Sequence, residues 1–183
     1  MPRRAVLSAA DRSILFTIPT DDGELIGHYT FDEQDLALIH QRRGGHNRLG
    51  FAIHLCYLRF PGYALPHDVT PPTGLLARVA RQLDLEPDLW PQYARRAETR
   101  REHLRELQFW LGLTPFDRDH FRAEVEHLTE LAAQADRGMA LATTLVERLR
   151  QQRVILPPID VIERVCAHAL VRGTRRVYEA LWT

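Results

Sequence analysis

The sequence predicts an all-α protein, and three observations favour this fold class. Apolar residues recur at helical spacing in nearly every segment, and no segment alternates apolar and polar residues as a half-buried strand would. Capping boxes and glycine or proline stops divide the chain into lengths typical of globular helices. With 183 residues, the chain is large enough for one good core or two small ones. We therefore expect two small helical subdomains with helix-turn-helix-like elements.

Residues 1–65 are expected to form the first helical subdomain. Its first helix starts between Ser8 and Asp11 and ends before Pro19, because proline cannot continue a helix. An acidic stretch follows and is interpreted as a solvated face turned away from any phosphate. It consists of Asp21, Asp22, Glu24, Asp32, Glu33 and Asp35.

Two further helices of this subdomain flank a glycine turn. The capping box Thr30-Phe-Asp-Glu33 predicts a helix that begins at Phe31, and Gly44-Gly45 permits the positive φ that ends it. Asn47 is expected to cap the next helix, which stops at Pro61-Gly62. Two helices joined by a short glycine turn are the layout of a helix-turn-helix DNA reader, and the alternative is a helical hairpin with a solvated basic turn.

The second helix of this pair, 48–60, is apolar on two sides and is expected to be mostly buried. Only a narrow stripe of Arg48, Ala52 and Arg59 is expected to stay outside the apolar faces. The helix would therefore meet DNA with its N-terminal end, where unpaired N–H groups and the helix dipole favour phosphate. The residues assigned to this contact are Arg42, Arg43, His46, Asn47 and Arg48.

Residues 66–72 contain three prolines and are interpreted as an extended linker, after which 73–183 form the second helical subdomain. The capping box Thr99-Arg-Arg-Glu102 opens one of its helices, and the short apolar connection 154–158 is expected to pack against the core. The expected helices of this subdomain lie at about 74–83, 87–93, 100–111, 117–135, 138–152, 159–171 and 174–182.

The helix 100–111 is the second candidate for DNA contact. Three leucines make its core stripe, while Arg101, Arg105 and Gln108 line a polar flank that could span consecutive base edges in a major groove. Arg95, Arg96 and Arg100 lie where phosphate contacts would set the register. The alternative is local ion pairing of Glu98 with Arg101 and of Glu102 with Arg105.

Five stretches spread over nearly the whole chain match motifs of one family in the expected order. They are Met1–Ser8, Gly23–Thr30, Arg42–Gly62, Thr99–Leu104 and Val154–Ala167. These stretches resemble the N-terminal region of the transposases of the Tn-three family, the replicative, cointegrate-forming transposons of bacteria. Gly27 and His54 depart from the residues usual in that family. The resemblance implies a DNA-binding module that recognises the terminal inverted repeats of its transposon.

The resemblance also implies that catalysis lies outside this chain. Family members are much longer, and their carboxylates for two divalent metals belong to a C-terminal RNase H-like domain. We therefore expect no catalytic residue, no bound metal and no cofactor here. The nine histidines support this expectation, because no pair has zinc-ligand spacing with a cysteine partner.

Composition adds weak support for a protein that contacts nucleic acid. The formal net charge is zero, but all 24 cationic residues are arginine, which binds phosphate and guanine bidentately. Codon usage in a GC-rich genome would produce the same bias. Cys56 and Cys166 are expected to be buried, reduced thiols. Without a signal peptide or a long apolar run, the protein is expected to be cytoplasmic and associated with the nucleoid.

Two other functions compete with sequence-specific DNA binding. The first is a helical protein-interaction module that assembles the transposase, with self-association through the remainder of the transposase. The second is a metal nuclease built from some of the 24 carboxylates. The nuclease ranks last, because these carboxylates lie on predicted solvated helical faces with no sheet to bring them together.

Overall fold

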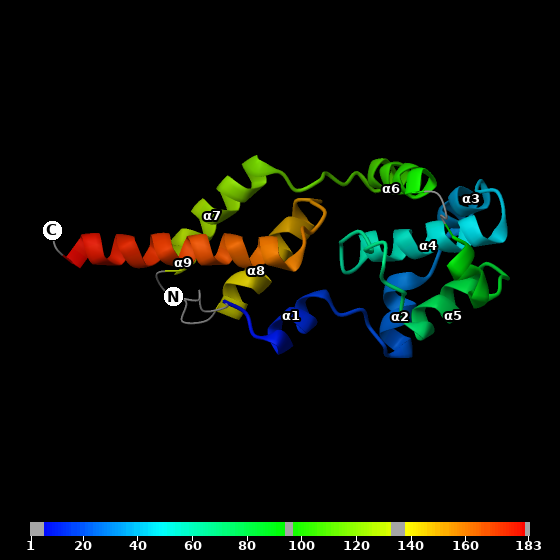
Figure 1. The fold of residues 1–183 in the computed structure, drawn as a ribbon, viewed down its shortest axis with the longest axis horizontal. Coiled ribbons are helices and arrows are strands. Elements are labelled where there is room, and N and C mark those ends of the chain that lie inside the picture. The colour runs from blue at the N-terminus through cyan, green and yellow to red at the C-terminus, as the bar shows by residue number, and fades with distance from the viewer. Residues whose placement is uncertain (1–5, 94–96, 133–137, 182–183) are drawn as a thin grey trace. The chain divides into compact units, whose positions relative to one another are not determined.

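The computed structural model describes residues 6–93, 97–132 and 138–181. In these ranges the regular secondary structure is helical (Figure 1). The all-α prediction is confirmed. The elements are α1 (Ala9–Phe16), α2 (Asp22–Tyr29), α3 (Glu33–His40), α4 (Gly45–Arg59), α5 (Thr73–Gln82), the 3₁₀ helix η1 (Pro87–Gln92), α6 (Ala97–Leu111), α7 (Arg118–Ala132), α8 (Gly138–Gln151) and α9 (Ile159–Leu181).

The chain divides into two compact units, and the division differs from the one expected from the sequence. One unit is Ile18–Leu113, and the other joins Met1–Thr17 to Thr114–Thr183. Residues 66–72 therefore lie inside a unit, because α4 packs against α2 and α3 before this segment and against α5, η1 and α6 after it. The helix α1 joins the later residues because it packs on α8.

The unit Ile18–Leu113 is built around α4, whose residues from Leu49 to Leu58 are all buried. This confirms that the helix is mostly buried and corrects one detail, because Ala52 is completely inaccessible. The expected cap is also wrong. Gly44, with φ of 80°, precedes the helix, and Asn47 lies in its first turn with the side-chain amide donating to the carbonyl of Arg43 at 3.0 Å.

The acidic stretch before α4 is not a solvated face throughout. Part of it forms α2, and Asp35 of α3 is only 2% exposed. The Asp35 carboxylate accepts two hydrogen bonds from the Arg59 guanidinium, at 2.7 and 2.5 Å. The helix α3 begins later than expected, because Asp32 caps it in a reciprocal pair with Asp35 and Phe31 is buried before it.

A cluster of rings joins η1 and α6 to α4. Gly50 of α4 faces the Tyr93 ring so closely that a Cβ at residue 50 would lie 2.1 Å from it. The Tyr93 hydroxyl is 3.0 Å from Nδ1 of His103, whose ring meets the Phe51 ring edge-on at 5.1 Å. The His54 ring, 5.6 Å from that of Tyr93, is fully buried and neither ring nitrogen has a hydrogen-bond partner.

The other unit is built mainly from α7, α8 and α9. Buried Glu124 of α7 accepts hydrogen bonds from Arg148 at 2.9 and 3.3 Å and from Gln152 at 2.9 Å. Burial raises the pKa of Glu124, but the hydrogen bonds from Arg148 and Gln152 and the nearby positive charge together outweigh it, so the pKa is lowered and the carboxylate stays ionised. The connection 154–158 packs inward as predicted, with Val154 and Leu156 both 3% exposed.

One long helix, α9, replaces the two expected at 159–171 and 174–182. Gly173 does not break it, because this glycine is the point where α9 approaches α7. A Cβ at residue 173 would lie 3.0 Å from the Cβ of Ala132 and 3.2 Å from the carbonyl oxygen of Thr129. Both cysteines are as expected: Cys56 in α4 and Cys166 in α9 are buried free thiols.

Replacing Gly50 with alanine should lower the free energy of unfolding by about 1–3 kcal/mol, the cost of overpacking a close contact. Gly27→Ala is the matched control, because this exposed helical glycine has no atom within 4 Å of its Cβ position. Alanine there should raise the free energy of unfolding by up to about 1 kcal/mol. Urea denaturation of both variants tests the contact, and equal stability of the two would contradict it.

Burial lowers the pKa of His54 to about 3, with a further contribution from the nearby Arg100 and His103. Below pH 6.5 the unfolded chain binds a proton that the folded chain excludes, so stability falls as the pH falls toward 3. The loss from His54 between pH 6.5 and pH 5 should be about 2 kcal/mol, at 1.36 kcal/mol for each pH unit.

His54→Leu should remove this part of the pH dependence and leave stability at pH 7 equal or higher, because two unpaired buried nitrogens are lost. His67→Gln, on an exposed loop residue, is the control and should keep the wild-type slope. Urea titrations at pH 7, 6 and 5 measure the difference. An unchanged slope in the leucine variant would rule out His54 as its source.

Candidate nucleic-acid interface

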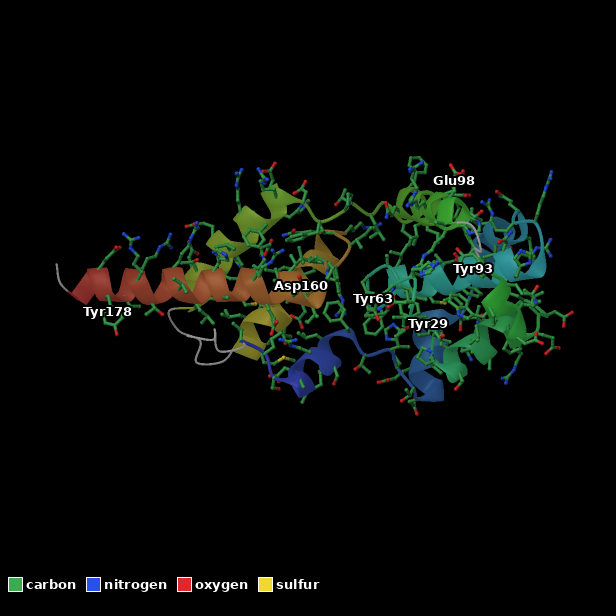
Figure 2. All side chains as sticks on the ribbon, in the orientation of Figure 1. Tyr29, Tyr63, Tyr93, Glu98, Asp160 and Tyr178 are labelled. Carbon is green, nitrogen blue, oxygen red and sulfur yellow. The ribbon has the colours of Figure 1, made fainter. Side chains whose placement is uncertain are left out.

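The inner side of α6 is fixed to the unit Ile18–Leu113 by several contacts. Leu107 is completely buried, and His103 lies in the ring cluster. Arg100 donates a hydrogen bond to the carbonyl oxygen of Leu65. Burial lowers the pKa of Arg100. Figure 2 shows Tyr93 against α4 and Glu98 on the opposite side of α6, so the helix has one anchored and one outward side.

The α6 face, defined as Arg101, Arg105, Gln108 and Phe109, is the outward side of this helix. Both arginines are exposed, and Gln108 is half-buried. Among the ion pairs of the described residues, none joins Arg101 or Arg105 to a carboxylate. The local pairs with Glu98 and Glu102 that would have explained these arginines are therefore not formed. The helix begins at Ala97, so the capping box expected at Thr99 is wrong.

The basic turn before α4 has a different arrangement. Arg43 is exposed, but the Arg42 side chain is only 16% exposed and forms an ion pair with Glu106 of α6 at 2.5 Å. The Arg42 guanidinium also lies 4.8 Å from the centroid of the Phe51 ring. Arg48 turns back to donate to the carbonyl of Arg42 at 3.0 Å. Two of the three turn arginines thus have partners inside the protein.

Of the four remaining residues predicted to contact DNA, the structure describes two. His46 and Asn47 are half-buried in the first turn of α4, and Arg95 and Arg96 lie outside the described residues. The structure therefore brings Arg101, Arg105 and Gln108 together on one face and leaves Arg43 exposed on the turn. Sequence reasoning overlooked Phe109, although its place four residues after Arg105 puts it on the same side of the helix.

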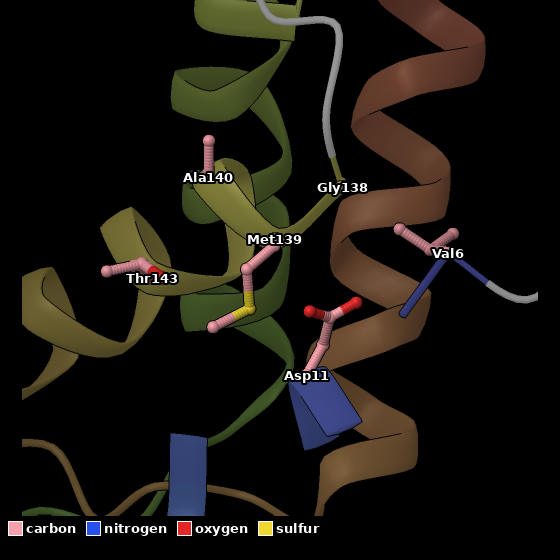
Figure 3. Close-up of a pocket in the computed structure, with 6 residues that line it drawn as sticks. All are labelled: Val6, Asp11, Gly138, Met139, Ala140 and Thr143. Atoms are coloured by element: carbon pink, nitrogen blue, oxygen red, sulfur yellow. The ribbon is translucent and has the colours of Figure 1, made fainter. Parts of the chain in front are cut away.

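Other kinds of site find little support in the described ranges. No group of three His, Cys, Asp or Glu side chains there could hold a metal ion. A surface pocket beside Met139 contains one carboxylate, Asp11, whose hydrogen bonds are to Ser8 of the same capping box (Figure 3). None of the described helices combines the length and apolar character needed to cross a bilayer.

One family model and several transposases match this chain. A family model described as Domain of unknown function (DUF4158) matches residues 6–169. The chain is 53% identical over 181 residues to the transposase for transposon Tn3926 of Escherichia coli and 51% identical to that for transposon Tn501 of Pseudomonas aeruginosa. A more distant relative, the transposase for transposon Tn1546 of Enterococcus faecium, is 28% identical over 178 residues.

These matches cover 97–99% of this chain but only 18% of each relative, so the chain spans about a fifth of the length of these transposases. They confirm the resemblance to Tn-three transposases that the five sequence motifs indicate. Because the family model covers nearly all of the described residues, the chain belongs to the DUF4158 family and is homologous to a part of the transposases of the Tn-three family.

Proposed function

We propose that this chain is a DNA-binding module of a Tn-three family transposase that recognises the terminal inverted repeats of its transposon. The α6 face carries the proposal, because it holds two arginines without carboxylate partners on a helix whose other side is anchored. A transposase must locate the ends of its element, and the relatives of this chain are named as transposases. Such a module acts where bacterial DNA lies, in the cytoplasm.

The chemistry of the α6 face suits base reading in a major groove. An arginine fork binds O6 and N7 of guanine bidentately, and a glutamine amide binds N6 and N7 of adenine. From Arg101 to Gln108 the helix rises by about 10 Å, which matches about three base-pair steps. Arg101, Arg105 and Gln108 therefore read neighbouring bases, while exposed Arg43 contacts phosphate together with the first turn of α4.

The partnered arginines have a positioning role in this proposal. The ion pair of Arg42 with Glu106 joins the turn before α4 to α6, although 64 residues separate the two along the chain. Arg100 connects α6 to the loop at Leu65. These contacts hold the reading helix at a defined orientation, which base recognition requires. The transesterification chemistry belongs to the remaining four-fifths of the transposase, so this chain performs no catalytic step.

Arg101→Ala and Arg105→Ala should each lower the preference for the terminal repeat over scrambled DNA by about 1–3 kcal/mol, the value of a bidentate base contact. The matched control is Arg81→Ala on α5, another exposed arginine of the same unit. Competition titrations with cognate and scrambled duplexes measure the preference. Equal losses on both duplexes would reduce the two arginines to phosphate contacts, and no loss on either would remove the α6 face from the interface.

Arg43→Ala should weaken binding to all duplexes alike and reduce the slope of log affinity against log salt by about 0.9, the value for one phosphate contact. Arg42→Ala should instead lower the melting temperature, because it leaves Glu106 without its partner and opens space beside Phe51. Salt titrations and melting curves of both variants separate the two roles. If the affinity of the wild type for DNA duplexes did not change with salt, the result would support a protein-interaction module instead.

A further inference from the structure

Phe109 is the most exposed large apolar residue in the described part of the chain, at 91%. It lies in the last turn of α6, while Leu107 two residues earlier is completely buried. The side of α6 that carries Leu107 therefore packs on the unit, and Phe109 points outward because it lies on the opposite side of the helix. A phenylalanine ring left in water forgoes a large favourable burial energy, which indicates a partner surface.

The charges around Phe109 favour a nucleic acid as this partner. Arg105 lies one helical turn before it, unpaired and exposed, and Gln108 lies beside it. Glu106, the carboxylate closest in sequence, is directed to Arg42. The two exposed carboxylates of the helix, Glu98 and Glu102, lie toward its N-terminal end. The C-terminal half of the α6 face is thus cationic and apolar, which suits the floor of a major groove lined by phosphates.

We propose that Phe109 reads thymine in the terminal repeat, by packing its ring against the C5-methyl group in the major groove. This inference rests on the proposed function of the α6 face. The thymine methyl group is the apolar feature that a base pair presents in the major groove, and phenylalanine is among the side chains that contact it. Phe109 lies about 6 Å beyond Arg105 along the helix axis, so the thymine lies about two base pairs from the base that Arg105 contacts.

The test replaces each thymine of the terminal repeat in turn with uracil, which removes the methyl group and keeps the hydrogen-bonding edge. Competition titrations compare wild type, Phe109→Ala and Phe109→Leu on every duplex. At one or two positions, uracil should weaken wild-type binding about fourfold, the value for burying one methyl group. Phe109→Ala should show the same loss on the unmodified repeat and no further loss with uracil at these positions, while leucine keeps part of the discrimination.

Controls separate this inference from the proposed function. Ile26→Ala removes another exposed apolar side chain of the same unit, from α2, and should leave every titration unchanged. A wild type that prefers the repeat but tolerates every uracil overturns the thymine contact alone. A wild type that does not prefer the repeat overturns the proposed function. A clear fall in melting temperature for Phe109→Ala, without change in discrimination, shows that the ring packs within the protein and also overturns the inference.

Discussion

The burial of α4 is the constraint on which the unit Ile18–Leu113 depends. Ten consecutive residues, Leu49 to Leu58, are removed from water on every side of the helix. A helix that is apolar all round must be surrounded, and α2, α3, α5, η1 and α6 all pack against it. Close packing leaves little freedom at these contacts, as the fit of the Tyr93 ring against Gly50 illustrates. The central helix therefore leaves little side surface for a partner.

This constraint decides which charged groups remain for a partner. Three cations predicted to bind DNA have partners inside the unit. Arg42 forms an ion pair with Glu106, Arg48 donates to the carbonyl of Arg42, and Arg100 donates to the carbonyl of Leu65. The exposed cations are those on surfaces that do not face α4, above all Arg101 and Arg105. With a formal net charge of zero, the proposed recognition of DNA would depend on this local arrangement and not on a general attraction to DNA.

Buried polar groups contribute specificity of packing in both units. Asp35 meets Arg59 with two hydrogen bonds, and Glu124 meets both Arg148 and Gln152. Such groups tolerate few alternative arrangements, because any shift leaves a charge buried without its partner. His54 is the exception, since it is buried with both nitrogens unpaired and is kept neutral by its surroundings. Burial of this unpaired ring destabilises the folded chain, and the destabilisation increases as the pH falls.

The sequence by itself determined the helical class, most helix positions and the mostly buried character of 48–60, because apolar periodicity and stop signals are local properties. Tertiary structure alone decided the limits of the two units and the continuity of α9, where close contact with α7 makes Gly173 a packing residue. It also decided which arginines are available. Arg42 and Arg101 both lie in basic stretches, yet only Arg42 meets a distant carboxylate. Ion pairs require segments far apart in the chain to approach one another, and no local pattern encodes that approach.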